Sequence, residues 1–356
     1  MKKLIITGYN LDFGGIEKAL INLLKKLDKN KYEITLLLRE KKGVFLKEVP
    51  THIKIKEYKL SNVKIKLLRK IINRLHLLTY IFLNKNKYDV AISYATYDIP
   101  FSIITKHIGK KSILYVHSNY THIYREEKDL RHFFDVRGIN LFDKIIFISN
   151  EAKNDLIKYY KNIKDKSYAI NNLYDFDEIK NKSKEKIKVK KNKKNLLFVG
   201  RLEDESKALF RLMNIMKTLD ESYQLTVIGS GPDESKLHKY KKDNTINNVE
   251  FLGSKSNPYP YMKEADLFVL QSYYEGFPVV AIEALTLETN VVTTINVSAG
   301  SFKLKDYVYL CKQDENDIKK LIIKALTENK KVNFDYKNFN KEILEDLDKV
   351  IEGEKS

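Results

Sequence analysis

Residues 265–285, "ADLFVLQSYYEGFPVVAIEAL", place a strand, a loop and a helix in direct succession. The run "LFVLQS" has the apolar side chains of a buried strand, and "YYEG" is the loop that leaves it. Pro278 suits the first position of the following helix, because its missing N–H costs no hydrogen bond there. A strand that passes directly into a helix is the repeating unit of parallel α/β sheets, so this stretch predicts the fold class.

The same alternation recurs on both sides of a basic segment. Before residue 176, short apolar or β-branched runs are mostly separated by helical patterns such as "IEKALINLLKKL". These runs are "KLIITGY", "YEITLLL", "IKIKEY", "YDVAISYA", "KSILYVH", "DKIIFIS" and "KSYAINN". The basic segment "FDEIKNKSKEKIKVKKNKKN" offers few apolar side chains to bury and reads as a linker. Strands and helices then resume with "NLLFVG", "YQLTVIG", "VEFLG", "ADLFVLQS" and "NVVTT".

Two similar α/β domains are therefore expected, which also fits a chain of 356 residues, since one core rarely serves that length. We predict an N-terminal Rossmann-like domain at 1–178, a basic linker at 179–194, a C-terminal Rossmann-like domain at 195–335, and a helical segment at 336–356 that packs back on the N-terminal domain. Ligands of parallel sheets bind beyond the carboxyl ends of the strands, so each domain is expected to present loops to a central cleft.

Composition and charge narrow the class of protein. Hydrophobic residues at 43% with 31% charged residues are typical of a globular protein, and the single Cys311 permits no internal disulfide. "MKKLIITGYNLDFGG" resembles a first strand rather than a signal peptide, and no run is long enough to span a membrane. The net charge of +18 favours an acidic partner, namely nucleic acid, an anionic membrane or a phosphorylated ligand, unless it only reflects a lysine-rich composition.

The helix after Pro278 offers an anion site. Its first amides, near Val279, Val280 and Ala281, lack intrahelical acceptors and lie at the positive end of the helix dipole. Glu283, farther along the helix, would accept hydrogen bonds from hydroxyls such as those of a ribose, and Glu275 on the loop from a second polyol. An anion between two hydroxyl-binding carboxylates matches a nucleotide-diphosphate sugar. The alternative is that Glu275 is a solvated loop residue and Glu283 lies on the solvent side of the helix.

Two cations follow another strand at the same predicted edge. In "FVGRLEDESKALFRL" the strand ends at Gly200, Arg201 comes next, and Lys207 lies six residues later. Arg201 can grip two phosphate oxygens while Lys207 acts as a point charge, so together they would offset the charge of a departing diphosphate. The alternative is that both are ordinary surface charges.

Glycines and one histidine follow other strands. Gly14 and Gly15 lie between the first strand and its helix, and Gly229 follows "YQLTVI". A glycine at such a position lets a ligand approach the backbone closely. The alternative is that these glycines only form tight turns. His117 ends "SILYVH", where it would hydrogen-bond a sugar hydroxyl or the reacting centre, or would serve a structural role.

Taken together and in this order, "GGIEKAL", "YVHSNY", "FVGRLEDESK", "VIGSGP" and "ADLFVLQSYYEGFPVVAIEAL" resemble a retaining glycosyltransferase of the GT-B fold, family 4. The resemblance covers nearly the whole chain. It implies that Glu275 meets the donor sugar, that Glu283 binds the ribose, and that Arg201 and Lys207 hold the diphosphate. The remaining implied donor contacts are His117 and the backbone of Gly14, Gly15, Gly229, Gly276, Phe277, Pro278 and Val279.

The resemblance also implies that no metal or other cofactor is needed, because the two cations and the helix N-terminus replace a metal electrostatically. Three departures stand out, one of which is that the acceptor half offers no motif of the family. Ala208 follows Lys207 where the family often has glycine, and "NVVTTINVSAGSFKL" lacks the usual Gly-Gly and following Glu.

The implied reaction moves a sugar from a nucleotide-diphosphate sugar, with UDP expected before GDP, to a hydroxyl of a lipid-linked or cell-surface glycan such as a capsule. We expect same-face displacement with retention, since no second carboxylate nucleophile is identified. Residues 63–82 form a basic amphipathic pattern that would either hold a cytoplasmic protein at the inner face of the membrane or pack its apolar stripe on the sheet.

Two other functions compete with this interpretation. One keeps the fold and gives a cytosolic transferase that acts on a protein or a small sugar. The other is a nucleic-acid-binding protein, which the charge permits. We expect no nucleic-acid partner, because the chain has no recognised nucleic-acid module and because that function leaves Glu275 and Glu283 unexplained.

Overall fold

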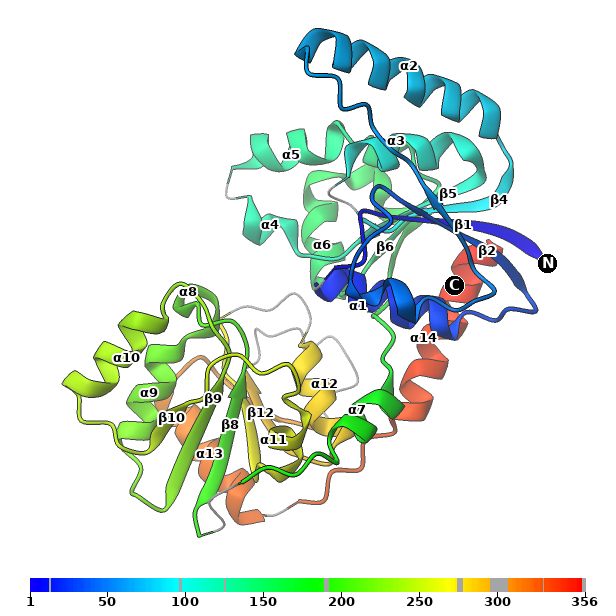
Figure 1. Ribbon diagram of the computed structural model, residues 1–356. Coiled ribbons are helices and arrows are strands. Elements are labelled where there is room, and N and C mark those ends of the chain that lie inside the picture. Colours follow the sequence, from blue (N-terminus) through cyan, green and yellow to red (C-terminus); the bar gives the residue numbers. More distant parts are fainter. Residues whose placement is uncertain are drawn as a thin grey trace. The chain divides into compact units, whose positions relative to one another are not determined.

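Figure 1 shows a computed structural model of the chain, which describes residues 1–12, 14–95, 98–124, 126–188, 192–273, 278–294, 307–328 and 330–353. The chain divides into two compact units. Unit 1 contains Met1–Tyr174 together with Asn338–Ser356, and unit 2 contains Asp175–Lys337. Among the described residues, no helix combines the length and the apolar content that crossing a bilayer requires.

Unit 1 is built on a parallel sheet of seven strands. In chain order they are β1 (Lys2–Gly8), β2 (Tyr32–Leu38), β3 (Lys54–Glu57), β4 (Tyr88–Ser93), β5 (Gly109–Val116), β6 (Lys144–Phe147) and β7 (Ser167–Ala169). Their order in the sheet is β3-β2-β1-β4-β5-β6-β7, with every neighbouring pair parallel. This is the order of a doubly wound Rossmann sheet, in which the direction of adding successive strands reverses between β1 and β4.

Helices cover this sheet and connect its strands (Figure 1). They are α1 (Gly15–Lys26), α2 (Lys66–Asn84), α3 (Ile99–Ile108), α4 (Tyr120–Ile123), α5 (Glu127–Asp135) and α6 (Asn150–Tyr159), with 3₁₀ turns η1 (Val44–Glu48), η2 (Ile139–Leu141) and η3 (Lys161–Lys166). Local sequence starts two of them. Asp98 accepts a hydrogen bond from the amide of Phe101 at the start of α3, and Ser149 accepts one from Ala152 at the start of α6.

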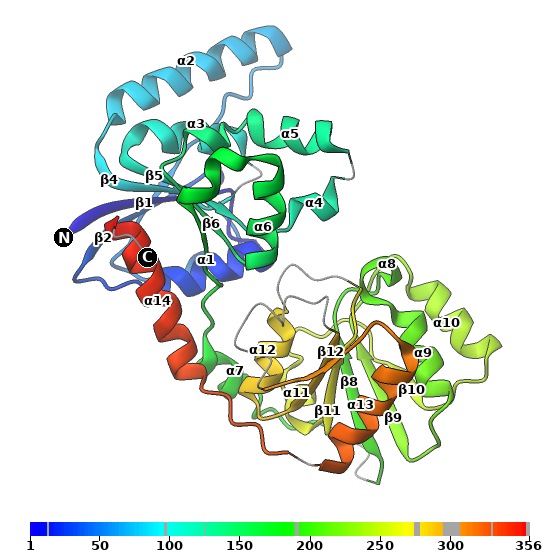
Figure 2. The ribbon, with the colours of Figure 1, turned by 180° about the vertical axis from the view of Figure 1, so that it is seen from behind.

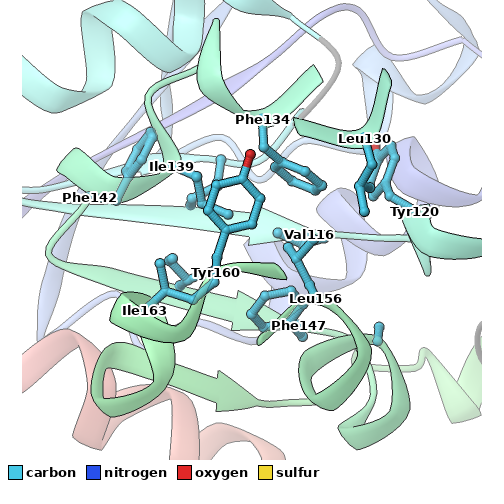
Figure 3. Packing of buried hydrophobic residues seen from close by; sticks show 13 residues of the cluster. Val116, Tyr120, Leu130, Phe134, Ile139, Phe142, Phe147, Leu156, Tyr160 and Ile163 are labelled. Carbon is cyan, nitrogen blue, oxygen red and sulfur yellow. The ribbon is translucent and has the colours of Figure 1, made fainter. Parts of the chain in front are cut away.

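Aromatic and branched side chains fill the core of unit 1. Figure 3 shows one cluster, in which Phe134 of α5 lies beside the ring of Tyr160, and Phe147 of β6 and Leu156 of α6 belong to the same cluster. The Tyr160 hydroxyl is not left unpaired in this apolar setting, because it donates to the Asp135 carboxylate at 2.8 Å. Helix α14 (Tyr336–Glu352) completes unit 1 and lies beside β1 and β2 (Figures 1 and 2), with the Tyr32 hydroxyl donating to Asp348 at 2.9 Å.

Unit 2 repeats the architecture with six parallel strands. They are β8 (Lys194–Val199), β9 (Tyr223–Ile228), β10 (Val249–Phe251), β11 (Leu267–Leu270), β12 (Asn290–Thr294) and β13 (Tyr309–Cys311), in the sheet order β10-β9-β8-β11-β12-β13. The helices are α7 (Phe176–Lys182), α8 (Asp204–Lys207), α9 (Leu209–Lys217), α10 (Glu234–Asp243), α11 (Tyr259–Glu264), α12 (Val279–Thr286) and α13 (Glu315–Glu328). All six strands run parallel, and the direction in which successive strands are added to the sheet reverses between β8 and β11.

The predicted α/β class with two parallel sheets is confirmed. The predicted linker differs from the structure, because its first residues belong to α7, which is capped by Asp175 and buries Phe176 and Ile179. The two buried side chains lie three residues apart, on one face of the helix, and therefore anchor the basic segment. Strand β13 was not predicted from its short run "YLC".

Candidate functional site

The loops after β8 and β11 define the candidate site of unit 2. These strands are direct neighbours, pairing Leu267 with Leu196 and Phe268 with Leu197, and the sheet order reverses between them. Loops that leave two such strands diverge at the carboxyl edge and open a crevice where parallel sheets bind ligands. Arg201 and Lys207 belong to the first loop, and the segment that leads to α12 belongs to the second.

The two loops are tied together by backbone hydrogen bonds. The amide of Tyr273 donates to the carbonyl of Ser206 at 2.8 Å. The side-chain amide of Gln271, which follows β11 directly, donates to the carbonyls of Lys207 and Ala208, each at 2.8 Å. Lys207 is therefore held at a fixed position against the end of β11.

The two cations have different surroundings. Arg201 is exposed, and its guanidinium lies 3.7 Å from the Glu203 carboxylate, a separation at which an exposed ion pair contributes little. Lys207 is half-buried as the last residue of α8. Arg201 can thus turn toward an anionic ligand at little cost, whereas the reach of Lys207 is set by its fixed backbone.

Helix α12 begins at Val279, so Pro278 is its N-cap residue and not its first helical residue as predicted. The amide of Ala281 donates to the Pro278 carbonyl at 3.0 Å, which removes Ala281 from the three amides expected to be free. The amides of Val279 and Val280 occupy the first two helical positions, where an α-helix supplies no acceptor. The anion site at this N-terminus is thus reduced to these two amides.

Glu283 does not point to solvent. Its side chain is half-buried and accepts a hydrogen bond from the Tyr259 hydroxyl of α11 at 3.1 Å. Burial, followed by the negative charge of Glu283, raises the pKa of Tyr259, so this tyrosine remains a hydrogen-bond donor. The hydroxyl of Tyr259 thereby helps to orient the carboxylate of Glu283.

Sequence reasoning missed a buried cation behind the two loops. Arg211 of α9 donates to the side chain of Gln271 at 2.7 Å and to its carbonyl, and to the side chain and carbonyl of Gln313 at 2.6 and 3.0 Å. Its guanidinium lies 4.5 Å from the ring centre of Tyr273. Burial lowers the pKa of Arg211. An arginine within the apolar run "ALFRLMNIM" was the available signal, because such a residue must find buried acceptors.

Ala208 shows why a smaller residue would suit its position. Its backbone has φ 54° and ψ 42°, in the left-handed region that favours glycine. The family often has glycine at this position, and the left-handed backbone conformation is the physical reason why glycine is favoured there.

Gly229 serves the backbone of its own sheet. A side chain on it would overlap the carbonyl oxygen of Gly200, and its φ of 147° also disfavours other residues. Gly231 similarly approaches Leu202, whose amide donates to Ser230 at 2.9 Å. These glycines bring the loop after β9 against the loop that carries Arg201, so the packing explains Gly229 without a ligand.

The predicted residues of unit 1 also follow strands at its carboxyl edge. Gly14 caps α1 in an extended conformation, and no described atom lies within 4 Å of the position a side chain on Gly15 would take. His117 directly follows β5 and packs between aromatic rings. Its own ring is stacked on that of Tyr115, with 4.9 Å between the ring centres, and the tilted ring of Tyr94 has its centre 4.3 Å away. The space beside Gly15 leaves room for a ligand.

His117 is neutral at physiological pH. Burial lowers the pKa of its imidazole to about 3, and the nearby backbone of Tyr94 opposes this shift only in part. Among the described residues, neither ring nitrogen has a hydrogen-bond partner of ordinary geometry. One nitrogen of a neutral imidazole accepts and the other donates, so His117 has both functions available.

A polar pocket of about 500 Å³ lies at the carboxyl ends of β1, β2 and β3. Its basic lining comes from Arg39 after β2, Lys59 after β3 and Arg69 of α2. The other lining residues are Tyr9, Glu40, Glu57, Leu60, Ser61, Asn62 and Asn73. Glu57 is paired with Lys59 at 3.2 Å and Glu40 with Lys42 at 2.7 Å.

Glu275, Gly276 and Phe277 lie outside the described residues, as do residues 295–306, which contain the departure from the family pattern after β12. In the part of the chain that the structure describes, the side chains of His122, Glu151 and Asp155 gather in a combination that occurs in metal sites. Asp155 already accepts from Asn119 at 2.9 Å and pairs with Lys158 at 2.7 Å, which accounts for it as a surface network.

Comparison with known families decides the class of protein. Residues 13–178 match "Glycosyltransferase Family 4", and residues 179–342 match "Glycosyl transferases group 1". The chain belongs to the family 4, group 1 glycosyltransferases. This confirms the resemblance drawn from the motifs, and with it the enzyme class.

Two curated relatives and one solved structure illustrate the likeness. An uncharacterized glycosyltransferase of Methanocaldococcus jannaschii is 32% identical over 161 residues, which are 43% of this chain and 39% of that protein. The chain thus matches less than half of that relative's length. A Campylobacter jejuni alpha-1,4-N-acetyl-D-galactosaminyltransferase, named for an acceptor on PP-undecaprenol, is 26% identical over 312 residues, 86% of this chain and 83% of that protein.

The crystal structure of Anabaena HepE in complex with UDP has a TM-score of 0.76 at 16% sequence identity, covering 98% of this chain and 100% of HepE. At 16% identity this structural similarity establishes the fold alone. This glycosyltransferase chain therefore has the predicted GT-B fold.

Proposed function

We propose that this glycosyltransferase moves a sugar from a UDP-sugar to a hydroxyl of a lipid-linked or cell-surface glycan, with retention at the anomeric carbon. The observation that carries the proposal is the pair of tied loops at the reversal point of unit 2. They bring Lys207 against the end of β11, next to the segment that leads to α12, and Glu283 is oriented within that helix. The charge and hydrogen-bonding capacity of these groups suit a nucleoside diphosphate.

In this proposal the diphosphate lies between Arg201, Lys207 and the first amides of α12. Each of these groups offers donors or positive charge to phosphate oxygens. Glu283 accepts hydrogen bonds from the ribose hydroxyls, and Tyr259 holds its carboxylate in place. Glu275 is proposed to meet the donor sugar, and His117 and the Gly14–Gly15 backbone remain predicted donor contacts. The uridine base is supported by the complex of HepE with UDP, which has the same fold.

The proposed chemistry is a displacement on one face of the donor sugar. The bond between the anomeric carbon and the β-phosphate oxygen breaks, the acceptor oxygen bonds to that carbon, and the acceptor proton passes to the departing phosphate oxygen. Arg201 and Lys207 stabilise the charge that develops on the phosphate. Their fixed positive charges replace a metal ion in this role.

The lipid-linked acceptor is supported by the Campylobacter relative, which is named for an acceptor on PP-undecaprenol. Arg69 lines the polar pocket in unit 1 and suits an acceptor that carries negative charge, whereas Lys59 is paired with Glu57 and Arg39 lies 3.6 Å from Asp98. The alternative acceptor is a protein or a small sugar. Transfer that requires the carrier lipid distinguishes the first from the second.

Calorimetric titration of the full chain with UDP, GDP and ADP, without added metal, tests the donor site. We expect one diphosphate to bind, and Glu283→Gln to weaken it by a factor of ten to a hundred, because a hydrogen bond to a charged group is worth about 1.5–3 kcal/mol. Glu264→Gln is the matched control, since Glu264 is an exposed carboxylate of α11 and should leave binding unchanged. Failure of the wild-type chain to bind any of the three diphosphates would refute the site.

A further inference from the structure

Helix α2 has two apolar faces, and only one of them is covered. Leu77, Tyr80 and Ile81 pack against a core cluster that includes Tyr58 and Phe101 of unit 1. Figures 1 and 2 show α2 on the outer side of α3, at the periphery of this unit. The predicted alternative, in which the apolar stripe of residues 63–82 packs on the sheet, therefore holds for this inner face alone.

The second face is an exposed stripe of large apolar side chains. Its members are between 50% and 79% exposed, and they are Leu67, Ile71, Leu75, Leu78 and Phe82. At about 100° per residue they fall within an arc of roughly 80° on a different side of the helix from Leu77 and Tyr80. A continuous apolar stripe of this kind marks an interaction surface, whereas single exposed apolar residues are common on any protein.

The charge around the stripe indicates what covers it. Residues 58–88 contain no aspartate or glutamate. Their basic residues are Lys59, Lys64, Lys66, Arg69, Lys70, Arg74, Lys85 and Lys87. Lys66, Lys70 and Arg74 are exposed on α2 itself. A surface that combines this stripe with unbalanced positive charge fits a partner that is apolar inside and anionic at its boundary.

A second copy of the chain fits this surface poorly. A two-fold interface brings identical patches together, so the basic residues of α2 would face those of its copy. Like charges in such contact repel one another. An anionic bilayer offers the opposite arrangement, with phosphates for the lysines and arginines and acyl chains for the stripe.

We propose that α2 docks unit 1 on an anionic membrane, lying in the plane of the interface with the stripe of Leu67, Ile71, Leu75, Leu78 and Phe82 at the boundary between headgroups and acyl chains. Lys70 and Arg74 contact lipid phosphates at its side. The inference does not depend on the proposed transfer reaction, because docking needs neither donor nor acceptor.

The chain has no tryptophan, so one introduced tryptophan reports on its own surroundings. Leu78→Trp places it in the stripe, and Ile123→Trp places it at an equally exposed site on α4, 58% exposed against 55% for Leu78. With vesicles of phosphatidylglycerol and phosphatidylcholine, we expect the emission of Leu78→Trp to shift to shorter wavelength and that of Ile123→Trp to stay unchanged. No shift at low salt would overturn the proposal.

Vesicle flotation of the full chain, otherwise unaltered, measures the affinity. Ile71→Gln/Leu75→Gln/Leu78→Gln should lower partitioning by at least about a hundredfold, because three large apolar side chains no longer enter the bilayer. Lys70→Gln/Arg74→Gln should lower it roughly 25-fold, at about fivefold for each charge, and high salt should have the same effect on the wild-type chain.

Ile123→Gln/Leu141→Gln is the matched control, since both side chains are exposed in unit 1 away from α2. Circular dichroism establishes that every variant is folded, which we expect because the replaced side chains are exposed and glutamine is a good helix former. Equal partitioning of the triple variant and the wild-type chain would place the contact elsewhere. A concentration-dependent dimer that the triple variant dissociates, with no vesicle binding, would show that a second copy covers the stripe.

Discussion

Replacement of Arg211 by methionine should destabilise unit 2 strongly. The guanidinium is buried and donates to two side-chain and two main-chain oxygens, supplied by Gln271 and Gln313. Methionine fills a similar volume and supplies no donor, so these acceptors lose their partner. At about 1 kcal/mol for each lost hydrogen bond the cost is about 4 kcal/mol, within the range of roughly 3–5 kcal/mol for breaking a buried charged network.

Urea unfolding of the full chain, followed by circular dichroism, measures this cost as a shift of the transition midpoint. Arg211→Lys should lose about half as much, because lysine keeps the charge but cannot reproduce the planar fork. Lys217→Met, in the same helix, is the control, since the exposed ammonium of Lys217 donates to Asn244 at the surface and its loss should change stability by less than about 0.5 kcal/mol. A loss below about 1 kcal/mol in Arg211→Met would contradict the network's structural role.

Three further outcomes are expected. Burial lowers the pKa of His117 to about 3 in the folded chain, from an ordinary value of about 6.5, so between these pH values the unfolded chain binds a proton that the folded chain does not. As the pH falls from 6.5 toward 3, wild-type stability should drop by about 1.4 kcal/mol per pH unit relative to His117→Gln. Parallel pH profiles of the two proteins would contradict this. Ala208→Gly should change the free energy of unfolding by less than about 1 kcal/mol, because relief of the left-handed strain offsets a lost buried methyl group and a more flexible unfolded chain; a larger loss in thermal denaturation would argue against strain. EDTA should leave the Kd for UDP unchanged in calorimetry, because Arg201 and Lys207 carry the positive charge; loss of binding with EDTA and its return with Mg²⁺ would refute this.

The fold was readable from the sequence because both sheets are buried on two faces. Strands in that setting are continuous apolar runs, as in "LFVL" of β11 and "YEITLLL" of β2, and helices of amphipathic pattern separate them. The exceptions are short or depend on tertiary contacts. Strand β13 has three residues. Helix α7 lies in a lysine-rich stretch, in which Phe176 and Ile179 are the buried side chains of the helix and the signal in the sequence that it packs against the rest of the protein.

The candidate site was readable where chemistry and strand ends coincide. Arg201, Lys207, Glu283 and His117 each follow a strand at the expected edge of their own sheet. Arg211 was not identified, because its role depends on Gln271 and Gln313, which lie 60 and 102 residues away along the chain. Gly229 has a local sequence that permits a ligand contact, yet its close neighbour is Gly200, which only the packing of β8 against β9 reveals.

The exposed stripe on α2 bears on the choice between the two proposed acceptors. An enzyme for a small sugar or a soluble protein gains nothing from exposing several large apolar side chains, which raise the risk of aggregation. A lipid-linked acceptor is confined to the bilayer surface, so docking there replaces a search through the solution and raises the local concentration of the acceptor. Arg69 lines the polar pocket, and the stripe begins at Leu67 on the same turn of α2, so one helix contributes to both surfaces. If the triple glutamine variant keeps its affinity for UDP and loses transfer to a carrier-bound acceptor alone, the two surfaces serve one substrate. If transfer to the carrier-bound acceptor proceeds equally in the triple variant and in the wild-type chain, membrane docking and acceptor choice are separate properties.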